Sequence, residues 1–142
     1  MGYMDQFGVA EARKEQRRWR TLLTLLAIVV VAASLFYWFK NCRQEQRVKE
    51  FLATLERSDY PGAYAFWGCR VEQPCPNYSY KDFLEDWGPD PPSPIGKLRS
   101  YRLGTSHARG SGVEIPVVLN DRVQKKLWVE KSNSTLGFAP PF

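Results

Sequence analysis

The sequence has few of the residues on which enzyme and metal chemistry depend. Among 142 residues it contains one histidine, His107, and three cysteines. Cys69 and Cys75 stand further apart than the roughly two- to four-residue spacing of zinc-binding cysteine pairs. No Ser–His–Asp or Cys–His arrangement and no phosphate-binding glycine loop can be argued from the other motifs. We therefore predict no catalytic residue, no metal site and no cofactor, and expect that the protein is not an enzyme.

Charge is absent from one stretch. Residues 21–39, TLLTLLAIVVVAASLFYWF, contain no acidic or basic side chain. At a rise of about 1.5 Å per residue, a helix of this length measures about 28 Å, close to the hydrocarbon core of a bilayer. Trp19 stands before the stretch and Tyr37 and Trp38 at its end, where amphipathic rings favour the headgroup region. We predict a transmembrane helix here, behind a short basic tail over residues 1–20.

Two alternatives compete with a transmembrane helix. A buried core helix normally carries a polar stripe, whereas only two threonines and a serine interrupt this apolar run. A cleaved signal peptide also has basic residues before its apolar region. However, the run continues through aromatic residues to Phe39, where a cleavage region turns small and polar. We therefore favour a retained anchor.

The basic residues on either side of the anchor suggest its direction. Five lie in positions 13–20, and four lie in positions 40–49, interleaved with Glu45. Cytoplasmic flanks are enriched in lysine and arginine, so the denser first cluster favours a cytoplasmic N-terminus by a margin of one residue. The following domain is then expected to be extracytoplasmic, either periplasmic or extracellular.

The net charge of +5 does not indicate a nucleic-acid partner. Residues 1–39 hold five basic and three acidic residues, and the remainder holds 15 and 12. A surplus of this size over a whole domain is ordinary surface charge. The N-terminal cluster is explained by topology and by anionic lipid headgroups. The lipid bilayer is therefore the first expected partner.

The cysteines bear on the compartment. Cys69 and Cys75 are close enough to form a small disulfide loop, and the prolines on either side of Cys75 suit a constrained turn. A disulfide requires an oxidising compartment, which agrees with the expected direction. The alternative is two free thiols in a cytosolic domain tethered to the membrane. Cys42, three residues past the anchor, is an acylation site, a dimer bridge or a spectator thiol.

Residues 40–142 are expected to form one soluble α+β domain. Apolar spacing and capping signals predict three helices, after which the period changes to that of strands. The predicted helices cover residues 44–57, 62–67 and 80–87. The predicted strands cover residues 98–103, 113–120, 123–131 and 135–138, giving a three- or four-stranded antiparallel meander. Because no glycine or proline separates the anchor from the first of these helices, we expect the anchor to continue into that helix and to hold the domain stiffly near the bilayer.

Three short motifs carry a family resemblance. They are Ser58-Asp59-Tyr60, residues 62–66 (GAYAF) and residues 79–83 (SYKDF). Over about residues 46–138 the chain resembles small extracytoplasmic domains of the nuclear transport factor 2-like superfamily. The resemblance implies a cone-like α+β fold with a cavity between sheet and helices, but no particular reaction. Leu136-Gly137-Phe138 departs from the tryptophan-containing last strand common in such domains, so the final strand is expected to be short or missing.

Aromatic side chains are numerous for a domain of this size. They are candidates to line an apolar pocket or a protein-binding surface, although we expect most of them to fill the core. His107 is expected to be exposed in a loop over residues 104–112, and Glu114 to point outward from a strand. The candidate pocket or interface residues are Tyr64, Trp67, Tyr80, Phe83, Trp87 and Trp128.

These features predict a function in binding and assembly. We expect a non-enzymatic, single-pass accessory or assembly subunit whose extracytoplasmic domain contacts other subunits of a membrane complex. The alternative is a membrane-tethered cone-fold domain that binds, or less readily turns over, a small apolar ligand.

Overall fold

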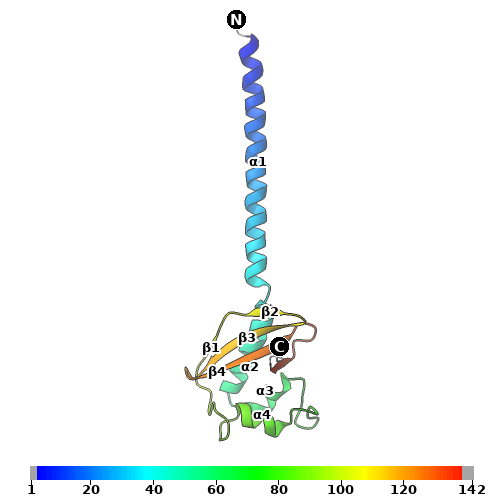
Figure 1. The fold of residues 1–142 in the computed structure, drawn as a ribbon, viewed down its shortest axis with the longest axis vertical. Helices are drawn as coiled ribbons and strands as arrows, with labels where there is room; N and C mark the ends of the chain where they lie inside the picture. Colours follow the sequence, from blue (N-terminus) through cyan, green and yellow to red (C-terminus); the bar gives the residue numbers. More distant parts are fainter. Residues whose placement is uncertain (1–2, 139–142) are drawn as a thin grey trace. The chain divides into compact units, whose positions relative to one another are not determined.

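A computed structural model describes residues 3–138 and divides the chain into two units, of which the first ends at Lys40 and the second begins at Asn41. The first unit is helix α1, Tyr3–Phe39 (Figure 1). Its apolar side chains are exposed, with Leu22 at 60% and Phe36 at 76%. Among the described residues, this one helix near the N-terminus is long and apolar enough to cross a membrane.

The three hydroxyl groups within the apolar stretch of α1 are satisfied inside the helix. Thr21, Thr24 and Ser34 each donate to the carbonyl four residues earlier, at 2.9, 2.8 and 2.8 Å. A polar group without a partner is costly in hydrocarbon, so these bonds make the stretch compatible with lipid.

The second unit begins with two turn residues and helix α2, Cys42–Glu56. The expected continuation of the anchor into this helix is therefore interrupted at Lys40 and Asn41. Asn41 has backbone angles of −108° and 3°, and its buried side chain donates to Ser106 Oγ at 3.1 Å. This long-range bond gives a reason for the break that composition alone does not contain.

Two further helices follow, as the capping signals predict. Asp59 caps α3, Tyr60–Ala65, by accepting from the Gly62 N–H, so this helix begins and ends two residues earlier than expected. Ser79 and Asp82 form a capping box at the start of α4, Tyr80–Trp87, which matches its predicted bounds.

Over residues 3–138 the sheet has five antiparallel strands, one more than the largest number expected. They are β1 (Tyr101–Leu103), β2 (His107–Arg109), β3 (Gly112–Leu119), β4 (Val123–Glu130) and β5 (Leu136–Phe138). The strand order across the sheet is β1-β3-β4-β5. β2 pairs with the first half of β3 and β1 with its last residues, so both short strands lie along the same edge of β3. The additional strand, β2, lies in the stretch that the sequence predicted as a loop.

Pro116 lies inside the central strand β3, although proline within a sheet is normally confined to edge strands and bulges. The Gly104 N–H donates to the Pro116 carbonyl at 2.7 Å, so the proline nitrogen faces the same side, between β1 and β2. The edge partner of β3 changes at this point, and an N–H is not needed for the ladder. The break in the edge is what accommodates the proline.

The core lies between the helices and one face of the sheet (Figure 1). Phe51 of α2 is at its centre, with its ring edge-on to those of Trp87 at 5.0 Å and Trp67 at 6.2 Å. Alternate residues of β3 and β4 supply the aliphatic wall. These wall residues are Val113, Ile115, Val117, Leu119, Leu127 and Val129.

Candidate functional site

The candidate pocket aromatics lie in two different places. Tyr64, Phe83, Trp87 and Trp67 are buried in the core, with exposures of 0, 0, 1 and 9%, and Tyr80 packs at its margin. Trp128 alternates with buried Leu127 and Val129 and therefore faces the other side of the sheet. The structure has one surface hollow beside Arg47 and another beside Asn120, and none of these six side chains lines either of them.

The structure confirms the disulfide between Cys69 and Cys75, whose Cα atoms are 5.3 Å apart. Tyr64 fastens the loop to the core, because its hydroxyl donates to the Tyr78 carbonyl at 2.5 Å and accepts from the Cys75 N–H at 3.3 Å. Cys42 is free and exposed. A buried tyrosine that the sequence offered as a pocket residue thus holds a loop in place.

A polar cluster lies at the end of α4. The Tyr78 hydroxyl donates to the Asp86 carboxylate at 2.9 Å, and Lys125 Nζ donates to the Asp86 carbonyl at 3.1 Å while lying 4.5 Å from the centre of the Trp87 ring. Burial, together with the bond to Asp86, raises the pKa of Tyr78, and burial lowers the pKa of Lys125. Lys125 thereby satisfies a terminal carbonyl of the helix, which is a structural role.

The face of the sheet opposite the core carries Glu114 in an unusual setting. It points outward, as expected, yet it is only 7% exposed and pairs with Lys126 Nζ at 3.5 Å. Trp128 lies directly opposite it on β4, and His107 lies opposite it on β2. His107 is exposed, as predicted, but it belongs to a strand and not to a loop. This row places one acid beside one histidine, without a nucleophile.

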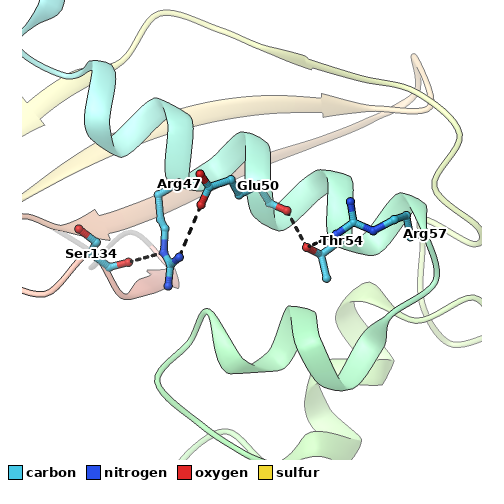
Figure 2. A network of polar contacts seen from close by, with 5 residues as sticks. All are labelled: Arg47, Glu50, Thr54, Arg57 and Ser134. Carbon is cyan, nitrogen blue, oxygen red and sulfur yellow. Dashed lines mark hydrogen bonds and ion pairs between the residues drawn. The ribbon is translucent and has the colours of Figure 1, made fainter.

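The first hollow, the arginine hollow, has a volume of about 360 Å³ and lies between α2 and the turn before β5. Arg47 lines this hollow, and Figure 2 shows its side chain reaching from α2 toward Ser134. Its Nε donates to the Ser134 carbonyl at 3.3 Å, its Nη1 is 3.6 Å from Glu50, and its guanidinium lies 4.2 Å from the centre of the Phe66 ring. Arg47 is therefore already occupied in joining α2 to the turn before β5 and to Phe66, which follows the end of α3.

The second hollow, the basic hollow, has a volume of about 460 Å³ and lies beyond the end of β3. Three cationic side chains line it, and no carboxylate does. Sequence reasoning missed this site because its residues come from the stretch before β1 and from the turn after β3. The lining residues are Ile95, Lys97, Arg99, Ser100, Asn120 and Arg122.

Within the described residues, no three histidine, cysteine, aspartate or glutamate side chains converge in a way that could hold a metal ion. Comparison of the chain with models of known protein families, with curated proteins and with solved structures finds no match. Of the two hollows, the basic hollow gathers cationic side chains without a carboxylate, whereas the arginine hollow contains Glu50.

Proposed function

We propose that this chain is a single-pass membrane protein whose α+β unit lies outside the cytoplasm and makes protein–protein contacts as an accessory or assembly subunit of a membrane complex. The observation that carries the proposal is the pairing of an exposed, charge-free helical stretch with a folded, disulfide-bonded unit. The apolar side chains of residues 21–39 need a cover, and lipid supplies one.

The disulfide and the basic flank support the direction. A stable disulfide is typical of oxidising compartments, and the denser basic cluster before the apolar stretch favours a cytoplasmic N-terminus. These two arguments are independent, since one depends on redox chemistry and the other on charge. The bilayer and neighbouring subunits are the partners that we propose.

The filled core supports a contact function over a ligand-carrying one. Phe51, Tyr64, Phe83 and Trp87 are at most 1% exposed and pack ring against ring, with centroids 5.0 to 6.4 Å apart where they contact. Side chains thus occupy the space that an apolar ligand would need. The ligand-binding alternative requires these rings to move.

We further propose that the unit is related to the nuclear transport factor 2-like superfamily. An order of three helices followed by an antiparallel sheet agrees with it, whereas the short last strand β5 is a departure from the family pattern. A cone-like fold of this kind is compatible with enzymes, carriers and assembly domains alike, so the resemblance does not choose between functions.

The test of the proposed function is crosslinking of the full chain in native membranes, followed by extraction in mild non-ionic detergent and size analysis. We expect a particle larger than the monomer, containing one reproducible set of other membrane proteins. The matched control is the same membranes crosslinked after denaturation, where this set should be lost. A chain that runs alone under every mild condition would overturn the proposal.

A further inference from the structure

The basic hollow carries positive charge that the rest of the unit does not neutralise. Lys97, Arg99 and Arg122 are all exposed, and the ion pairs found among the described residues include none of them. The nearest acid in the chain, Asp121, lies 3.0 Å from Arg102 and is thereby occupied elsewhere. Like charges gathered without a counter-charge raise the local potential and attract an anionic partner.

A single asparagine holds the walls of this hollow in place. Asn120 Oδ1 accepts from the N–H groups of Arg99 and Ser100 at 2.7 and 3.3 Å, and its Nδ2 donates to the carbonyls of Ile95 and Lys97, each at 3.1 Å. Leu98, 3% exposed, anchors the same segment in the core. The backbones that carry the cations are thus fixed before a partner arrives, which lowers the entropic cost of binding.

The contacts within the hollow favour a chain of carboxylates over a small free anion. A tight site for one phosphate needs convergent donors that are fixed and free, such as backbone N–H groups. Here the N–H groups of Arg99 and Ser100 already donate to Asn120. The exposed side chains of Lys97, Arg99 and Arg122 remain, although one Nη of Arg122 already donates to the Pro94 carbonyl at 3.4 Å. Such side chains suit a partner with several negative charges spaced along a chain.

The proposed function favours a protein over lipid headgroups as the occupant, because it expects the unit to contact neighbouring subunits. The three cations come from two separate segments of the chain, residues 97–99 and Arg122. A segment with carboxylates at several of its residues can pair with cations spread in this way.

We propose that the basic hollow is a docking site for an acidic, carboxylate-rich segment of a neighbouring protein. This inference rests on the proposed function and adds to it the surface and the chemistry of the contact. Lys97, Arg99 and Arg122 supply charge and hydrogen-bond donors. The guanidinium of Arg99 can pair bidentately with a carboxylate, and Arg122 contributes the N–H groups that its bond to Pro94 leaves free.

The test measures binding of a fluorescent glutamate decapeptide to the full chain in neutral detergent micelles, by anisotropy at about 50 mM salt, where surface charge is weakly screened. The double variant Arg99→Glu/Arg122→Glu should bind about tenfold or more weakly. The matched control Arg70→Glu/Arg109→Glu changes the net charge equally at two exposed arginines outside the hollow, and should bind within about twofold of the wild type. Thermal unfolding checks that both double variants fold. If the charge-reversal variant Arg99→Glu/Arg122→Glu does not fold, Lys97→Gln/Arg122→Gln replaces it.

Three outcomes would overturn the inference. Equal loss in both double variants would mean attraction by net charge alone. Displacement of the peptide by inorganic phosphate at a comparable concentration would indicate a small-anion site. In a third assay, phosphatidylcholine vesicles that carry the chain are mixed with phosphatidylglycerol vesicles. Clustering of the two kinds of vesicle that is lost in the reversal variant, together with no binding of the peptide, would indicate a lipid surface. None of these results depends on the crosslinking test, so failure of the proposed function and failure of the hollow are distinguishable.

Discussion

Asn120 joins segments of the chain that are 20 to 25 residues apart, and it does so in a left-handed backbone conformation with a φ of 51°. Asn120→Ala removes four side-chain hydrogen bonds and leaves a Cβ residue that tolerates this conformation poorly. We expect a loss of about 2 kcal/mol in the free energy of unfolding, less than the sum of four bonds because the site is partly exposed. Denaturant titration of the full chain in micelles measures it.

Asn120→Gly separates the two contributions of that residue. Glycine adopts the positive φ without strain but makes no side-chain bonds, so this variant should fall between the wild type and Asn120→Ala. Stability within about 0.5 kcal/mol of wild type in both variants would show that the bonds to Ile95, Lys97, Arg99 and Ser100 contribute little.

Tyr78 makes the stability of the unit sensitive to alkali. Its pKa is raised above the ordinary value of 10.0, first by burial and then by its bond to Asp86. Stability from this group is therefore fully present below pH 10 and is lost as the pH rises above it, because the unfolded chain ionises first. Tyr78→Phe should cost about 1 kcal/mol at neutral pH and should flatten the decline above pH 10.

Lys125, which belongs to the same polar cluster as Tyr78, changes stability with pH in the opposite direction. The pKa of Lys125 is lowered by burial, so its contribution to stability rises as the pH approaches its ordinary value of 10.5. Lys125→Met is therefore the matched control, and it should steepen the alkaline decline. Denaturant titrations at several pH values compare the three chains, and an equal alkaline slope in wild type and Tyr78→Phe would contradict the assignment.

At the scale of elements, helix α4 depends on its capping box. Ser79 Oγ accepts from the Asp82 N–H at 3.2 Å, and Asp82 accepts from the Ser79 N–H at 3.0 Å. Ser79→Ala should cost about 1 kcal/mol, whereas the exposed Ser132→Ala should cost almost nothing.

Bonds from Ser79 lower the pKa of Asp82, so the stability they add is lost as the pH falls through that pKa. Ser79→Ala should thus be less acid-sensitive than wild type, as acid titration of helicity would show.

Some helices and strands could be predicted from local sequence signals alone, and others could not. The bounds of α4 were predictable because Ser79 and Gly88 mark its two ends within the sequence itself. Strand β2 was not, because its three residues are all exposed and its only support is pairing with β3. The break between α1 and α2 was missed for the same reason, since the bond from Asn41 to Ser106 spans 65 residues.

At the scale of the whole molecule, the disulfide and the apolar helix follow from sequence, whereas the basic hollow does not. Lys97 and Arg99 flank Leu98 in the sequence with the alternation of an exposed strand, and the predicted strands over 113–120 and 123–131 leave a short connection between them. Nothing local states that the turn folds back onto the basic segment, because one asparagine side chain makes that connection. Sites assembled from distant segments need the tertiary fold.

The three cysteines together report the topology of the whole chain. Cys42 is free and exposed just after the apolar helix, whereas Cys69 and Cys75 are bonded to each other. In intact cells, a membrane-impermeant maleimide should label one thiol per chain, and Cys42→Ser should abolish this labelling. Two more thiols should react only after reduction and unfolding, because Cys69 is 2% exposed. A domain facing the cytosol predicts the reverse, with no labelling before permeabilisation and reduced thiols at Cys69 and Cys75. That result would overturn the proposed direction while leaving the membrane anchor in place.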